Sequence, residues 1–190
     1  MTPGTGMHTK PYKGILFLDV DGVLNSEAWF KSEEYKKRRL TLRNGTTEHT
    51  VNFSAAQIAN EKQDLDYHIS VLRDTHIDPV ALENLNWMLE KANLAIVLSS
   101  TWRLSDLTRN ALSQIGIDHY QERLQGITPF MRGVRGNEIQ QWIDQNEFKG
   151  KFCILDDDGD MEHLGVYLIQ TSWKDGLTRS IARSIVELFE

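Results

Sequence analysis

The chain has 190 residues, enough for one domain with a sizeable hydrophobic core and a modest insertion. Its net charge of −6 disfavours a broad electrostatic grip on nucleic acid, which usually needs a basic face. A single cysteine, Cys153, excludes an internal disulfide and a multi-cysteine zinc site, and no apolar run is long enough to span a membrane.

The first residues, 1–12, are rich in Gly, Pro and Thr and predict a flexible leader. They lack the apolar stretch of a secretory signal peptide, so we expect a cytoplasmic protein. The remaining residues, 13–190, are expected to form a single domain.

Short apolar runs and helical patterns alternate along the rest of the chain. Four runs have the length and composition of buried strands: 15–19, 94–98, 151–155 and 166–169. Apolar residues at helical spacing predict helices that begin at Pro79, near Ser105 (ending at Gly116), at Asn137 (ending at Asn146) and after Thr178. This alternation predicts an α/β fold, a three-layer Rossmann-like parallel sheet covered by helices on both faces.

Residues 26–77 interrupt this alternation and are interpreted as a small cap-like insertion. Residues 26–39 resemble a charged helix, and 57–72 again have a helical pattern. Between them, Asn44-Gly45 separates two alternating segments within 40–53, which predicts a β-hairpin. The insertion is therefore expected to contain helices and a hairpin.

Side chains able to do chemistry follow three of the four predicted strands. Asp19 and Asp21 come at the end of the first strand, and Ser99 and Ser100 follow the second. The third strand is followed by four acids within five residues: Asp156, Asp157, Asp158 and Asp160. Because ligands bind beyond the carboxyl ends of an open parallel sheet, we expect these residues to meet at one site.

The two acids of the first strand are two residues apart, so their carboxylates project from the same side of an extended chain. Like charges this close raise one another's pKa unless a cation neutralises them, and oxygen ligands favour a hard ion such as Mg²⁺. A bare Asp-x-Asp, or an acidic loop, is more often a solvated turn or a helix cap. The joint placement of these acids after strands favours a magnesium site.

Three segments carry a resemblance to a known family. FLDVDGVLN (17–25) resembles the first motif of the haloacid-dehalogenase-like (HAD) superfamily, an apolar strand followed by DxDGxLN. IVLSSTWR (96–103) resembles the second motif, and FCILDDD (152–158) resembles the fourth. Together with RGNEIQQWI and QTSWKDGLT, they resemble the branch of small HAD domains related to the phosphatase domains of nucleic-acid repair enzymes.

The resemblance implies a role for each matching acid. Asp19 attacks phosphorus and forms an aspartyl-phosphate. Asp21 protonates the leaving oxygen and then activates the water that hydrolyses this intermediate. Mg²⁺ is held by Asp19, the backbone carbonyl of Asp21, and Asp156 or Asp157. Which acid of the run 156–158 contacts the metal is left open.

The resemblance also implies residues that bind the phosphate. Ser99 would hydrogen-bond the phosphoryl oxygens, and Ser100 is the alternative if the register is one residue off. The third motif of the family usually has a lysine; here Arg135, at the mouth of a predicted helix, is the best substitute, and Arg132 is the second. Arg103, four residues past Ser99, is a further candidate to reach a substrate phosphate.

A basic run lies next to aromatic residues within the insertion. The basic residues are Lys36, Lys37, Arg38, Arg39 and Arg43, and the aromatic residues are Trp29, Phe30 and Tyr35. Such a stretch can contact a nucleic-acid backbone and stack a base. The alternative is a solvated helix face beside Glu33 and Glu34. Trp102 and Trp173, which follow strand ends, are candidates to shape the site.

These patterns predict a Mg²⁺-dependent phosphatase that acts on a phosphomonoester. Its substrate is expected to be a nucleotide or a phosphorylated nucleic-acid end, or alternatively a small sugar or metabolite phosphate. Two other hypotheses are a non-catalytic nucleic-acid-binding protein on the same scaffold and a phosphotransferase or mutase with the same intermediate. The sequence leaves the oligomeric state open.

Overall fold

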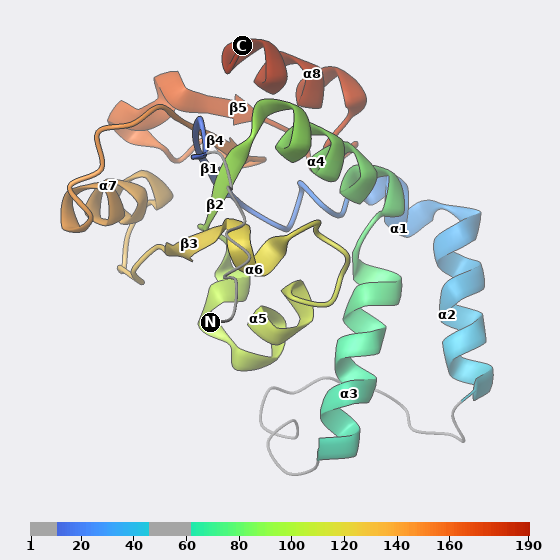
Figure 1. Ribbon diagram of the computed structural model, residues 1–190. Coiled ribbons are helices and arrows are strands. Elements are labelled where there is room, and N and C mark those ends of the chain that lie inside the picture. Colours follow the sequence, from blue (N-terminus) through green and yellow to red (C-terminus); the bar gives the residue numbers. More distant parts are fainter. Residues whose placement is uncertain (1–10, 46–61) are drawn as a thin grey trace, which may run out of the picture.

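The computed structural model describes residues 11–45 and 62–190. Residues 1–10 of the predicted leader, 1–12, therefore lie outside the described residues. In the described part, five parallel strands form one sheet in the order β3-β2-β1-β4-β5 (Figure 1). In chain order the strands are β1 (Gly14–Leu18), β2 (Leu94–Leu98), β3 (Leu124–Ile127), β4 (Phe152–Asp156) and β5 (Leu168–Gln170).

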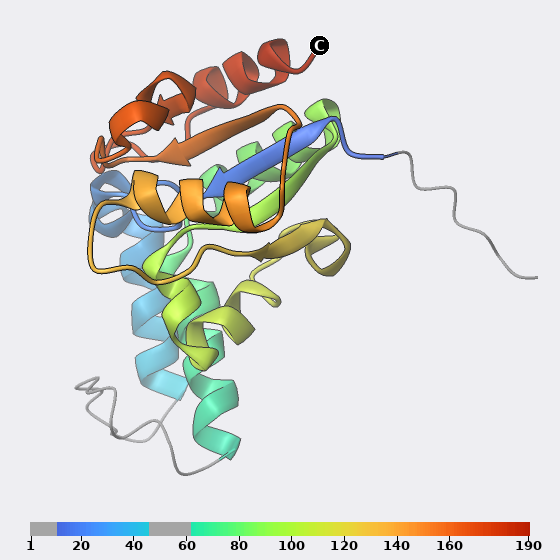
Figure 2. The same cartoon turned by 90° about the vertical axis from the view of Figure 1, so that its left-hand side faces the viewer.

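Helices cover both faces of this sheet. Leu16 and Leu18 of β1 pack in one buried cluster with α4 (Pro79–Ala92) and α8 (Arg179–Leu188). Phe17, which points the other way, packs in a second cluster with α7 (Arg135–Gln145). Figure 2 shows α7 on one side of the sheet and α4 with α8 on the other. The predicted three-layer α/β fold is confirmed.

Burial on both faces explains why the central strands are apolar at every position. All five residues of β1 and all five of β2 are buried, so neither strand shows the alternation of a half-exposed strand. The predicted strand 94–98 has the bounds of β2, and the other three predicted strands overlap β1, β4 and β5. The strand β3 was not predicted.

Capping side chains set where two of the predicted helices begin. The Asp78 side chain accepts a hydrogen bond from the Val80 amide at the start of α4, where Pro79 occupies the first turn. Thr178 caps α8 by accepting from the Ile181 amide. The predicted helix near Ser105 is shorter than expected: α5 (Asp106–Leu112) ends four residues before Gly116.

Most of the described residues of the insertion are helical. It contains α1 (Glu27–Lys31), α2 (Glu33–Gly45), α3 (Lys62–Val71) and a π-helical turn, η1 (Leu72–His76). Both α2 and α3 project away from the sheet in the same direction (Figures 1 and 2).

The predicted hairpin is wrong over 40–45, because α2 continues to Gly45, and the remainder of 40–53 lies outside the described residues. Asn-Gly marks the end of a helix as readily as a hairpin turn, since both need a left-handed residue. No helix in the ranges 11–45 and 62–190 is long and apolar enough to cross a membrane.

Candidate active site at the strand ends

Strand register brings four polar residues into one row at the carboxyl edge of the sheet. Leu18 of β1 is paired with Leu98 of β2 and with Leu155 of β4, and Leu98 is paired with Ile127 of β3. The next residue of each strand, taken across the sheet, is Thr128, Ser99, Asp19 and Asp156. All four are at most 5% exposed.

The row faces the helix α7. Side chains alternate along a strand, so Asp19, Ser99 and Asp156 project to the same face as the residues two positions earlier in their strands. Those earlier residues, Phe17, Val97 and Ile154, belong to the buried cluster that contains α7. The first residue of α7 is Arg135, and the fold therefore directs this arginine towards the acids.

Arg135 lies within ion-pair distance of both buried acids. Its Nη2 is 3.6 Å from Asp19 Oδ1, and its Nε is 3.9 Å from Asp156 Oδ2. The loop after β4 holds the helix in place: Asp160 Oδ2 accepts from the Arg135 amide at 3.0 Å, and Asp160 O accepts from the Gly136 amide at 3.1 Å. A β-carbon on Gly136 would lie 2.2 Å from Met161 O, so this close approach requires glycine.

A third acid joins the row from the same loop. Carboxylate oxygens of Asp19, Asp156 and Asp157 all lie within 4.8 Å of one another. Gly22 allows this approach, because it adopts a φ of +70° and an added β-carbon would lie 2.1 Å from the Asp157 carboxyl carbon. Asp158, by contrast, is exposed, and its amide donates to Asp156 Oδ1 at 3.0 Å.

The acids destabilise one another's charged forms. Burial raises the pKa of Asp19 to about 8; the Asp156 charge adds to this effect and the Arg135 charge opposes it. Burial also raises the pKa of Asp156 to about 6 and raises the pKa of Asp157. One guanidinium therefore does not offset the repulsion among these carboxylates.

The acid cluster fits a hard divalent cation. Its donors are carboxylate oxygens alone, as Mg²⁺ prefers, and Asp156 Oδ2 is buried with no hydrogen-bond partner among the described residues. Asp19, Asp156 and Asp157 are the three residues that would hold the ion. All three were predicted as ligands, and the geometry favours Asp156 and Asp157 over Asp158.

Asp21 is positioned by two donors rather than by the acid cluster. Asn25 Nδ2 donates to Asp21 Oδ1 at 2.7 Å, and Trp102 Nε1 donates to Asp21 Oδ2 at 3.0 Å. Asn25 is held in turn, because its Oδ1 accepts from the Gly22 amide at 2.9 Å. Trp102 thus shapes the site by orienting a carboxylate, and the partly exposed Asp21 lies at the edge of the cluster.

The two serines of the second motif differ in their hydrogen bonding. Ser99 is fully buried, and its hydroxyl has no hydrogen-bond partner in the part of the chain that the structure describes. The Ser100 hydroxyl accepts from the Trp102 amide at 3.3 Å and hydrogen-bonds Asp19, which acts to lower the pKa of that carboxyl. Ser99 is therefore the serine with an unused donor in the row.

Arg103 has no free donor for the phosphate contact that the sequence suggested. Its side chain is 1% exposed, and all five of its N–H groups have protein acceptors. Those acceptors are Thr128 O, Ser99 O, Ser100 O, Pro129 O and Glu138 Oε2. A guanidinium with no remaining donor cannot bind a ligand without breaking these bonds, so Arg103 positions the loop after β2 instead.

The family model for the HAD domain in Swiss Army Knife RNA repair proteins matches residues 15–182. The chain belongs to this family. The expected membership of the HAD superfamily is confirmed, and the roles of the strand-end residues described above stay predictions. The match spans the insertion as well as the sheet.

Among solved structures, the HAD domain is similar to a haloacid dehalogenase-like family hydrolase from Streptococcus pneumoniae. The identity is 12%, the similarity covers 92% of this chain and 90% of that chain, and the TM-score is 0.47. No curated protein matches the sequence.

Thr128 is the member of the row that sequence reasoning missed. Its hydroxyl is buried without a hydrogen-bond partner among the described residues, like that of Ser99 beside it. The signal was weak because β3 has only four residues and half of them are exposed. The alternating run Leu124–Ile127 followed by threonine was the one available indication.

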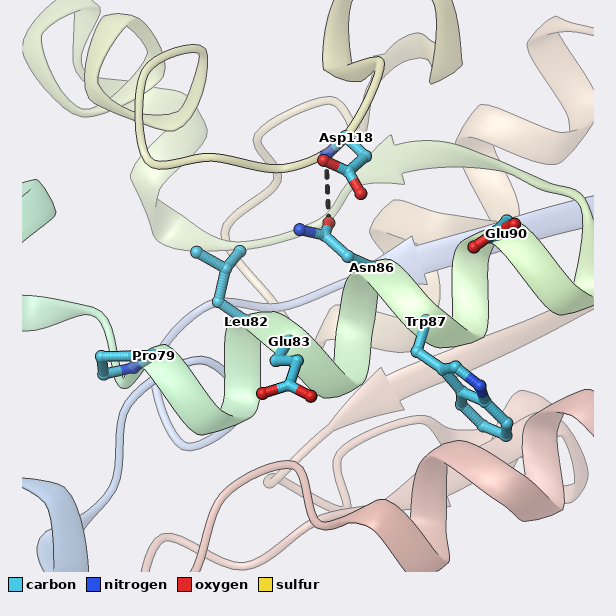
Figure 3. A pocket seen from close by; sticks show the side chains of 7 residues that line it. All are labelled: Pro79, Leu82, Glu83, Asn86, Trp87, Glu90 and Asp118. Atoms are coloured by element: carbon cyan, nitrogen blue, oxygen red, sulfur yellow. Dashed lines mark hydrogen bonds between the residues drawn. The ribbon is translucent and has the colours of Figure 1, made fainter.

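A shallow groove along α4 is separate from this row (Figure 3). It is lined by Pro79, Leu82, Glu83, Asn86, Trp87, Glu90 and Asp118. It contains none of the strand-end residues, and its three acids have no arginine among the lining residues.

Proposed function

We propose that the protein is a Mg²⁺-dependent phosphomonoester hydrolase that works through an aspartyl-phosphate, and that its substrate is a nucleotide or a phosphorylated nucleic-acid end. The observation that carries this proposal is the row itself. A buried aspartate lies between two further acids and a guanidinium, with a second aspartate two residues along the chain. The family's occurrence in RNA repair proteins supports a nucleic-acid substrate.

The first half of the reaction transfers the phosphoryl group to the protein. A carboxylate oxygen of Asp19 forms a bond to phosphorus while the bond from phosphorus to the ester oxygen breaks. Asp21 gives its proton to that leaving oxygen, so the product alcohol departs neutral. Asn25 and Trp102 fix the orientation of Asp21 for this proton transfer.

The second half of the reaction hydrolyses the aspartyl-phosphate and regenerates the Asp19 carboxylate. Asp21, now a carboxylate, removes a proton from water, whose oxygen attacks phosphorus and displaces the Asp19 carboxylate. Arg135 and Ser99 would bind the phosphoryl oxygens through donors that the protein leaves unused. Mg²⁺, held by Asp19, Asp156 and Asp157, would favour the ionised form of Asp19 and offset phosphoryl charge.

The alternative of a non-catalytic nucleic-acid-binding protein is less well supported. The basic run lies on α2, where Lys36 pairs with Glu33 at 2.5 Å and Arg38 pairs with Glu34 at 3.0 Å. These pairs match the interpretation of a solvated helix face. A binding role would also leave no use for a buried cluster of acids with raised pKa values. A cytoplasmic location stays a prediction.

The proposal is tested by phosphate release from glycerol phosphate and from a phosphorylated oligonucleotide in the presence of Mg²⁺. Asp19→Asn should lower kcat/KM by on the order of 10⁴ or more, because it removes the nucleophile. Asp118→Asn is the matched control, since Asp118 is an exposed acid outside the site. Chelation of Mg²⁺ should also abolish turnover. Full activity in chelator, or in Asp19→Asn, would contradict the mechanism.

A further inference from the structure

Four aromatic rings gather beside the strand-end site. Phe30 of α1 lies at their centre, with ring centroids 5.3 Å from Tyr35, 6.2 Å from His76 and 6.0 Å from Trp173. These residues come from α1, α2, η1 and the loop after β5. We call this set, Phe30, Tyr35, His76 and Trp173, the aromatic platform.

Two hydrogen bonds, one between backbone groups and one from a side chain, attach the platform to the loop that carries Asp21. The Glu27 amide at the start of α1 donates to Trp173 O at 2.8 Å. Thr171, two residues before Trp173, donates from its hydroxyl to Gly22 O at 2.8 Å. The segments that bear Phe30 and Trp173 therefore lie against the loop that begins at Asp21.

A further backbone hydrogen bond places the segment of His76 against the same loop. The Asp78 amide, two residues after His76, donates to Leu24 O at 2.8 Å. Burial lowers the pKa of His76, while the negative charge of Asp21 acts in the opposite direction. Because His76 also contacts Phe30, the platform lies beside the loop that carries Asp21.

The platform differs from the aromatic residues of the core in its exposure. Trp173 is 49% exposed, whereas Phe17, under the row, is 0% exposed. Phe30, Tyr35 and His76 are half-buried. A guanidinium lies over one ring as well: Arg39 is 5.8 Å from the centre of Tyr35. One exposed ring beside three half-buried rings, with a neighbouring cation, suits a planar group that is joined to an anion.

We propose that the aromatic platform is a stacking subsite for the base of a phosphorylated nucleotide whose phosphate lies at Asp19. This inference rests on the proposed phosphatase function and narrows its substrate class. Base–aromatic stacking tolerates any base, because every base has a π-face, and arginine adds a cation–π contribution. The platform therefore selects nucleotides over sugar or other small phosphates without reading sequence.

The test compares substrates that differ only in the base. We would measure kcat and KM for a nucleoside monophosphate, a phosphorylated single-stranded oligonucleotide, the same oligonucleotide with an abasic terminal nucleotide, and glycerol phosphate. Aryl phosphates are unsuitable as reference because their own ring can reach the platform. The variants are Trp173→Ala, Trp173→Phe and Phe30→Leu, each checked for an unchanged thermal midpoint.

Trp173→Ala should raise KM about 5- to 150-fold for substrates that carry a terminal base, the range expected for loss of one stacked base. It should change KM less than about twofold for the abasic oligonucleotide and for glycerol phosphate. Trp173→Phe keeps a ring and should restore most of the affinity. Phe30→Leu should act in the same direction as Trp173→Ala.

The outcomes separate the two proposals. If the wild-type protein hydrolyses all four substrates with equal kcat/KM, or Trp173→Ala weakens all four alike, the stacking subsite is wrong and the phosphatase function stands. If the wild-type protein hydrolyses none of them, the phosphatase function is wrong and the subsite falls with it. If Trp173→Ala raises KM for the nucleoside monophosphate alone, the substrates are free nucleotides. If it raises KM for the monophosphate and for the phosphorylated oligonucleotide, the substrates include the ends of nucleic-acid strands.

Discussion

Arg103 contacts the row at Ser99 and Thr128, and Arg135 contacts it at Asp19 and Asp156. Both arginines have largely buried side chains, 1% and 16% exposed. Every N–H group of Arg103 has an acceptor, including the Glu138 carboxylate at 2.5 Å. The nearest acid oxygens to Arg135 are 3.6 and 3.9 Å away, and its Nη1 has no hydrogen-bond partner among the described residues.

This difference separates a residue that holds the fold from one that is available to a ligand. Buried polar groups in native proteins are almost always hydrogen-bonded, so an unsatisfied guanidinium between two acids indicates a missing partner. The two regions are also connected. Glu138 lies one turn after Arg135 on α7 and accepts from the Met131 amide at 2.9 Å, so the Arg103–Glu138 pair helps to position the helix that carries Arg135.

The largest expected effect comes from removing Arg103. Arg103→Ala leaves the Glu138 carboxylate buried without its partner, which should lower the free energy of unfolding by about 3–5 kcal/mol. Arg103→Lys should recover little, because an ammonium has three donors where the site uses five. Urea denaturation measures both changes.

The control for that experiment is Arg73→Ala, which removes a surface pair with Asp74 and should cost at most about 1 kcal/mol. A stable Arg103→Ala protein that has lost affinity for substrate would contradict the comparison. That result would restore the role in phosphate binding that the sequence suggested for Arg103.

A smaller effect, on activity instead of stability, is expected for Arg135. Arg135→Ala should lower kcat/KM about 10- to 150-fold, the equivalent of one or two charged hydrogen bonds to the phosphoryl group. Arg135→Lys should keep part of the activity, since a lysine is usual in the third motif of the HAD superfamily. Arg132→Ala is the matched control, because Arg132 is exposed. A larger loss in Arg132→Ala would make Arg132 the phosphate-binding residue.

The main features of the fold could be predicted because buried parallel strands leave continuous apolar runs. Once 15–19, 94–98 and 151–155 are read as such strands, the residues that follow them must meet at one edge of the sheet. The order of the strands therefore predicts that Asp19, the serines and the acidic run lie together, and this prediction does not depend on side-chain partners.

What could not be predicted depends on partners that are distant in sequence. Arg103 follows Ser99 by four residues, as expected for a phosphate-binding arginine, but three of its five acceptors come from Thr128, Pro129 and Glu138. The edge strand β3 was not predicted, because half of its four residues are exposed and it does not form a continuous apolar run. The described residues of the insertion, 26–45 and 62–77, contribute no strand to the sheet, so the sheet register does not constrain their positions relative to the site.

The smallest expected effect is the pH dependence of stability without metal. It tests whether the strand-end acids beside Arg135 lack partners that Arg103 has. The folded protein raises the pKa of Asp19 from 3.8 to about 8 and that of Asp156 to about 6. An acid with a raised pKa binds its proton more tightly in the folded state. Its contribution to stability is therefore complete below pH 4 and is lost as pH rises through the folded pKa.

In chelator, the free energy of unfolding should consequently fall by up to about 1.4 kcal/mol for each pH unit between pH 7 and pH 8, where Asp156 is largely ionised and folded Asp19 still holds much of its proton. The thermal midpoint would fall by about 2–4 °C for each kcal/mol. Asp19→Asn cannot ionise, so its midpoint should change little over that range and should exceed that of the wild type at pH 8. Saturating Mg²⁺ should remove the fall in the wild type, because the ion favours the charged form. If the thermal midpoint of Asp19→Asn fell equally with pH, the titration would belong to another group. The strand-end acids would then have partners as complete as those of Arg103.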